Sequence, residues 1–157
     1  MQIIKNFLPE EEFNNLKNTL TGGEFPYYFQ DSVATFEDTK HFYFIHELYN
    51  DHLPQSHCFN IILPFLKKLN MSSLVRAKVN CFPRSEKLIK YGKHSDQKFS
   101  LNGAILSLNT CNGGTYVEDE FIPSIANQLL LFDSGIPHQS TNCTDEKCRF
   151  NINVNYF

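Results

Sequence analysis

The sequence predicts an α+β, mainly β fold in which N-terminal helices buttress a jelly-roll core. Helical patterns are confined to the first 73 residues, whereas short runs of alternating polar and apolar residues, separated by turn-forming residues, begin at Leu74. Short strands joined by short turns are typical of antiparallel jelly rolls. A length of 157 residues fits one domain. We expect a single domain over 1–157, with 1–73 as a helical, aromatic-rich support and 74–157 as the core.

Two helices are expected in the N-terminal part. The segment 8–20 opens with proline and glutamates, places apolar side chains on one face and is followed by two glycines. The segment 59–69 is also apolar but contains Pro64, which we expect to kink or divide the helix. The aromatic-rich segments 25–29 and 41–45 are interpreted as strands or loops.

The C-terminal part shows patterns with a period of two residues. Within 75–82, four small or apolar residues alternate with arginine, lysine, asparagine and phenylalanine, as expected of a strand with one buried face. Further strands are expected within 99–108, 115–117, 129–132 and 149–156. Turn-forming residues at 112–114, 126–128 and 133–135 separate them.

Composition excludes some classes of protein. Hydrophobic residues make up 41% of the chain, which is too apolar for global disorder, and a net charge of -3 gives no overall reason to expect a nucleic-acid or membrane partner. The sequence shows no apolar run long enough for a signal peptide or a membrane-spanning helix, so we expect a soluble, cytoplasmic protein. Five widely spread cysteines, an odd number, do not suggest a disulfide framework.

The clearest chemical motif is His94-Ser-Asp96. Alternate residues of an extended backbone project to the same side, so both side chains can reach one ion. His138 is the only other histidine in the C-terminal half and is the candidate third ligand. Two histidines and a carboxylate favour non-haem Fe(II) with open coordination positions. An isolated H-x-D motif is common by chance, so the hypothesis of an iron site depends on further residues typical of such a site.

A further residue typical of such a site is Arg149, which lies eleven residues after His138 at the start of the last expected strand. On that strand it shares the polar face with Asn151, Asn153 and Asn155. This face either points to solvent or lines the mouth of the barrel, and the three metal-competent residues favour the second interpretation. A guanidinium grips a carboxylate through two parallel hydrogen bonds and keeps its charge when partly buried.

The set formed by His94, Asp96, His138 and Arg149 resembles the pattern of the Fe(II)/2-oxoglutarate-dependent oxygenases, particularly small prolyl-4-hydroxylase-like members, including those encoded by tailed phages. The resemblance extends to 102–109 with the Gly113-Gly114 turn, and to 125–138, which is similar to the segment that delivers the distal histidine. It implies a double-stranded β-helix and Fe(II) bound by His94, Asp96 and His138. It also implies that Arg149 holds the distal carboxylate of 2-oxoglutarate, that O2 is a cosubstrate, and that ascorbate is a further candidate cofactor.

The sequence departs from the family pattern at two positions. Phe82 and Ser107 stand where relatives often carry a tyrosine that donates a hydrogen bond to the cosubstrate. Asn80, Lys78 and Thr115 are the candidates that replace these donors.

The sequence constrains the identity of the substrate less than it constrains the metal ligands. The resemblance implies hydroxylation of a peptide or protein, as in prolyl hydroxylases. A nucleic-acid substrate is the alternative, because nine of the 14 basic residues fall within 67–98. A non-enzymatic jelly-roll module that binds a metal or small ligand is the alternative from another class. The similarity to phage-encoded members is also compatible with action in a host cytoplasm.

Overall fold

A large antiparallel sheet organises the molecule. The computed structural model describes residues 1–34, 38 and 40–157. Seven strands are hydrogen-bonded in the order β1-β9-β6-β11-β5-β3-β2, and β4 pairs with β3 at the edge. Their bounds are β1 Gln2–Ile4, β2 Tyr28–Gln30, β3 Tyr43–Asn50, β4 Leu53–Pro54, β5 Leu74–Pro83, β6 Asn102–Ser107, β9 Leu129–Asp133 and β11 Cys148–Tyr156.

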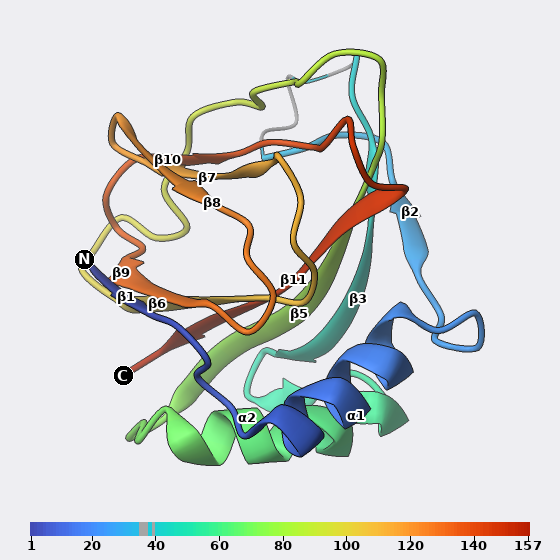
Figure 1. Cartoon of the computed structure of the whole chain (residues 1–157). Helices are drawn as coiled ribbons and strands as arrows, with labels where there is room; N and C mark the ends of the chain where they lie inside the picture. Colours follow the sequence, from blue (N-terminus) through green and yellow to red (C-terminus); the bar gives the residue numbers. More distant parts are fainter. Residues whose placement is uncertain (35–37, 39) are drawn as a thin grey trace.

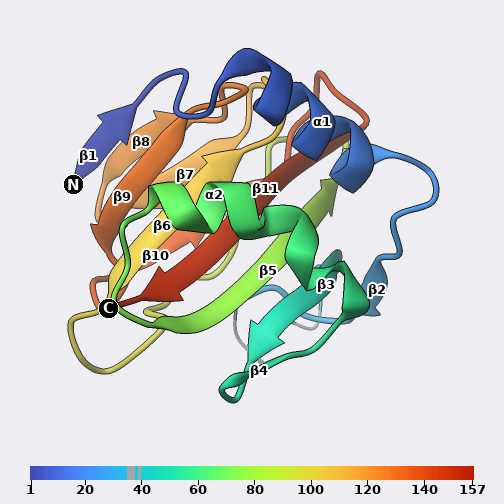
Figure 2. The ribbon, with the colours of Figure 1, turned by 90° about the horizontal axis from the view of Figure 1, so that it is seen from below.

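A smaller sheet and the helices lie on opposite sides of this large sheet (Figure 1). The small sheet has the order β10-β7-β8, with β7 Gly114–Val117, β8 Glu120–Pro123 and β10 His138–Ser140. Helix α1 (Glu10–Thr21), the 3-10 helix η1 (His57–Ile62) and α2 (Leu63–Lys68) form the helical layer. Figure 2 shows α1 and α2 lying across the large sheet. The expected fold class, a β core of jelly-roll type supported by helices, is confirmed.

The alternation of side chains in β5 and β11 separates the two faces of the large sheet. One face carries apolar residues such as Val79 and Ile152, which are fully buried in the main hydrophobic cluster with Leu16 and Leu20 of α1. A second cluster fills the space between the sheets: Ile105, Val117, Ile122, Leu130 and Phe132. The other face of β5 and β11 is polar although its β11 residues are buried, which is the arrangement of a site rather than of a surface.

The helix expected over 59–69 is divided, in agreement with the expected effect of its proline: a 3-10 turn runs up to Ile62, and an α-helix carries Pro64 in its first turn, where a missing N–H costs nothing. Other elements differ from the sequence-based expectation. Phe99 lies outside β6. The short strands β1, β4, β8 and β10 have no sequence signal, because two to four residues are too few to show a period. Among the described residues, no helix is long and apolar enough to cross a membrane.

Candidate active site

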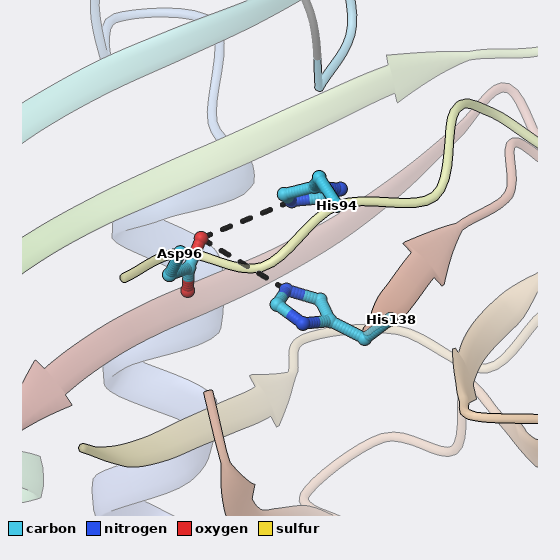
Figure 3. A group of neighbouring side chains, drawn as sticks. All are labelled: His94, Asp96 and His138. Atoms are coloured by element: carbon cyan, nitrogen blue, oxygen red, sulfur yellow. Dashed lines mark ion pairs between the residues drawn. The ribbon is translucent and has the colours of Figure 1, made fainter. Parts of the chain in front are cut away.

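Backbone pairing brings the H-x-D motif to the distal histidine. His94 and His138 form an antiparallel bridge in which each backbone N–H donates to the other's carbonyl, at 3.0 and 2.8 Å. Two residues further on, the Asp96 N–H donates to the Ser134 carbonyl at 3.0 Å. The loop that carries the motif thus runs beside β10 and the turn before it. Figure 3 shows the three side chains turned toward a common centre.

The geometry of these side chains suits one metal ion. The His94 Nε2 and His138 Nε2 atoms lie 3.8 and 3.9 Å from Asp96 Oδ1. These separations are shorter than twice a metal–nitrogen bond of about 2.1 Å, so one ion can reach each pair of atoms. Each histidine Nδ1 contacts a backbone carbonyl, Gly92 at 3.2 Å and Ile136 at 3.0 Å. A carbonyl only accepts, so Nδ1 carries the proton and the Nε2 lone pair is left for a metal.

Two further side chains hold the Asp96 carboxylate. Arg76 donates to Oδ1 at 3.0 Å and Asn155 donates to Oδ2 at 2.9 Å. Burial by itself would raise the pKa of Asp96, but Arg76, His138 and the Asn155 amide outweigh it and the pKa is lowered. Asp96 is therefore ionised at neutral pH and oriented toward the histidines. Arg76 and Asn155 were not singled out from the sequence individually, although the alternation of β5 and β11 places both on the polar face.

Metal affinity should depend on pH through the histidines. Burial, and then the neighbouring His138, lower the pKa of His94 below its ordinary value of 6.5. A lowered pKa extends the pH range in which the ring is neutral and able to coordinate. We expect Zn(II) affinity to be nearly constant from about pH 8 to 7 and to fall below about pH 6, where protons compete for the imidazoles. Titration with Zn(II) at a series of pH values checks this, and a midpoint above pH 7 would contradict it.

A cavity of about 260 Å³ opens beside the three side chains. Its wall comes from the loop after β2, from the polar faces of β3, β5 and β11, and from the triad. Lys78 and Asn80, two of the expected cosubstrate residues, line it. The Asn80 amide donates to Asn151 Oδ1 at 2.8 Å, while Asn80 Oδ1 is buried without a partner. Unpaired buried polar atoms are costly, which is a reason to expect a ligand here.

Arg149 adjoins this cavity rather than lining it. The side chain is 1% exposed and donates from Nη1 to the Thr141 carbonyl and from Nη2 to Thr115 Oγ1, both at 2.9 Å. Its Nε is buried with no partner, and within the described part of the chain no carboxylate pairs with it. Burial lowers the pKa of Arg149 to about 10, so the guanidinium is still charged at pH 7. The alternative of a solvent-facing Arg149 is excluded.

An aromatic ring packs against Arg149 and belongs to a larger group of rings. Its guanidinium carbon lies 5.3 Å from the centre of the Phe82 ring, and Tyr43 and Tyr91 stack on Phe82 at 5.3 and 5.7 Å. Burial raises the pKa of Tyr91 to about 12 against the opposing influence of the nearby Arg149. Tyr91 thus adds to the rings around Phe82 a phenol, which positions 82 and 107 lack. Sequence reasoning missed Tyr91, because it lies in an irregular loop with no periodic signal.

The Gly113-Gly114 turn allows the backbone to approach Arg149 closely. A Cβ atom on Gly113 would lie 1.9 Å from the Asn142 carbonyl oxygen and 3.1 Å from Arg149 Cδ. We expect Gly113→Ala to lower the free energy of unfolding by about 1–3 kcal/mol, the usual range for overpacking, and to displace Arg149. Urea denaturation measures the effect. Gly23→Ala is the matched control, because a Cβ there meets nothing within 4 Å, and equal stability of the two variants would contradict the argument.

Comparisons with known proteins support the fold. No protein-family model and no curated protein sequence matches the chain. Among solved structures, a prolyl hydroxylase from Trichoplax adhaerens in complex with a hypoxia inducible factor peptide has a TM-score of 0.67 at 18% identity, covering 99% of this chain and 82% of the other. A Pseudomonas putida prolyl-4-hydroxylase has a TM-score of 0.65 at 14% identity, with 99% and 91% covered.

A third similar structure is a viral collagen prolyl hydroxylase from Paramecium Bursaria Chlorella virus-1, solved as its 2OG complex. Its TM-score is 0.64 at 12% identity, with 98% of this chain and 93% of the other covered. Identities this low establish a shared fold and leave substrate and residue roles to be tested. The resemblance found in the sequence is therefore confirmed at the level of the fold: this chain shares the fold of these solved prolyl hydroxylases.

Proposed function

We propose that this protein is an Fe(II)- and 2-oxoglutarate-dependent dioxygenase that hydroxylates a peptide or protein in the manner of a prolyl hydroxylase. The observation that carries the proposal is the convergence of His94, Asp96 and His138 beside a cavity that adjoins a buried arginine with no carboxylate partner in the described part of the chain. When bound, Fe(II) supplies the redox chemistry with O2 that protein side chains lack.

The roles of the chain's own residues follow from their positions. The two imidazoles and the Asp96 carboxylate would hold the metal beside the cavity that receives the cosubstrate. Arg149 receives the distal carboxylate of 2-oxoglutarate, with its Nε as the unused donor. Phe82, the cross-strand partner of Arg149, lines the cavity, so Arg149 lies one residue away from the cavity wall. Asn80, Lys78 and Thr115 remain candidate contacts of the cosubstrate.

The nucleic-acid alternative receives less support from the positions of the basic residues. Lys68 bonds to the Phe7 carbonyl, Arg76 pairs with Asp96, and Lys90 lies 3.8 Å above the Tyr116 ring. Three of the nine cations of the 67–98 window are thus engaged in separate local contacts. A sequence-independent nucleic-acid surface instead requires a continuous basic stripe.

Succinate formation from 2-oxoglutarate tests the proposal. We expect the Fe(II)-loaded protein to produce succinate and a proline-rich peptide to stimulate it, whereas single-stranded DNA should not. Without oxygen, Fe(II) and 2-oxoglutarate together should give a visible absorption band. A protein that binds metal but shows neither the band nor succinate would be a non-enzymatic binding module. Stimulation by DNA alone would favour the nucleic-acid alternative.

A further inference from the structure

Two basic side chains of one strand line the cavity, one of which already holds Asp96 and the other of which is a candidate contact of the cosubstrate. Arg76 and Lys78 are alternate residues of β5 and both line the cavity, and we call them the cationic pair. Arg76 Nη2 is engaged by Asp96, and Arg76 Nε is buried without a partner among the described residues. The Lys78 amine has one weak contact, with the Tyr43 hydroxyl at 3.4 Å, and no ion pair within the same part of the chain. The cationic pair therefore holds hydrogen-bond donors that these residues leave unused.

The charge balance shows that the metal and the cosubstrate do not satisfy the cationic pair. The charges of Fe(II) and Arg149 together balance those of Asp96 and the two carboxylates of 2-oxoglutarate. Arg76 and Lys78 are left over inside the cavity. Glu47, the cross-strand neighbour of Lys78, is not on the cavity wall and makes no ion pair with it. Counted over the residues that the structure describes, the loaded site therefore has an excess of positive charge, which favours an anionic occupant.

The environment of Lys78 is consistent with this excess of positive charge in the cavity. Burial, and then Arg76, lower the pKa of Lys78 to about 8, so the amine still holds its proton at pH 7. Its charged form is destabilised by the surroundings, and a neighbouring anion would relieve that destabilisation.

We propose that the cationic pair is a subsite for a carboxylate of the substrate, placed close to the carbon that is oxidised. This inference rests on the proposed function and narrows its substrate class to an amino-acid unit that carries an acid group, either a free carboxylate or an acidic side chain beside the reacting residue. A carboxylate fits better than a phosphate for two reasons. Arg76 is already shared with Asp96, which leaves Lys78 as the main charge for a monoanion. The cavity, at about 260 Å³, is also small for a nucleotide in addition to 2-oxoglutarate.

Binding to the Zn(II)- and 2-oxoglutarate-loaded protein, which performs no redox chemistry, tests the subsite. The probes are N-acetyl-L-proline and N-acetyl-L-prolinamide, which differ in one charge, with methyl phosphate as a third. NMR titration should show the acid binding at least about tenfold more tightly than the amide. Lys78→Met should abolish this preference and Lys78→Arg should largely keep it. Lys67→Met, which replaces an exposed lysine of α2, is the matched control and should keep the preference for the acid fully.

Each remaining outcome decides the proposal. It is overturned if wild type binds the acid no better than the amide, or if the preference survives in Lys78→Met. Tighter binding of methyl phosphate than of the acid overturns the carboxylate assignment in favour of a phosphate-bearing substrate. If Lys78→Met weakens 2-oxoglutarate binding but not the acid preference, Lys78 belongs to the cosubstrate site. Failure of 2-oxoglutarate to bind wild type would count against the proposed function alone, and the same comparison of probes is then made on the protein without it.

Discussion

Replacement of His138 by alanine should lower Fe(II) or Zn(II) affinity by more than about 100-fold and abolish succinate formation. Removing a residue that merely supports a metal ligand costs up to about 100-fold, and loss of the ligand itself should cost more. His94→Ala and Asp96→Ala should have the same effect, because all three donor atoms lie within 4.8 Å of one another. Calorimetric titration with Zn(II) measures the affinity without any need for turnover.

A buried histidine outside the candidate metal site provides the control for these substitutions. His46 is 2% exposed and its ring nitrogens contact the Pro26 carbonyl and Ser56 Oγ, both at 2.6 Å. His46→Ala should lower the free energy of unfolding but leave the metal affinity of the folded protein unchanged. Metal affinity retained in His138→Ala, or lost equally in His46→Ala, would refute the proposed ligand set.

Replacement of Arg149 by methionine should weaken 2-oxoglutarate binding by about 100-fold or more, since truncating one partner of a buried charge pair usually costs several kcal/mol. The same substitution should change the free energy of unfolding of the ligand-free protein by only about 1 kcal/mol. The variant loses two hydrogen bonds but no longer buries a charge that has no carboxylate partner among the described residues. A small effect on stability combined with a large effect on binding distinguishes a ligand-holding arginine from a structural one.

Thermal unfolding with and without 2-oxoglutarate separates the two effects. At a concentration of 100 times its Kd, the ligand should stabilise the wild type by about 2.7 kcal/mol and should stabilise Arg149→Met far less. Arg84→Met, which removes an exposed arginine, should respond to the ligand as the wild type does. Equal stabilisation of Arg149→Met and wild type would remove Arg149 from the cosubstrate site.

Local patterns predicted most of the core strands and the candidate metal ligands. The period of two residues in 75–82 and 149–156 identified β5 and β11, and it placed Arg149 on the same face as Asn151, Asn153 and Asn155. Extended backbone always sends alternate side chains to one side, so this information is contained in the sequence. The same holds for His94 and Asp96, whose spacing alone allows a shared ion.

What needed the tertiary structure was every relation between distant segments. Whether the polar face of β11 points inward depends on the small sheet that covers it, and strands as short as β8 and β10 leave no pattern to read. The roles of Arg76 and Asn155 around Asp96, and of Tyr91 near Arg149, depend on contacts between residues 20 to 59 positions apart.

The sequence by itself thus determined the type of fold, the faces of the long strands and the residues able to bind a metal. Each of these follows from local backbone geometry. Only the tertiary structure decided that His94 and His138 pair along their backbones, that Arg149 is buried with no counter-charge among the residues described, and that Arg76 and Lys78 line the cavity. Burial and charge balance are properties of the assembled sheets, because they depend on which segments exclude water from one another.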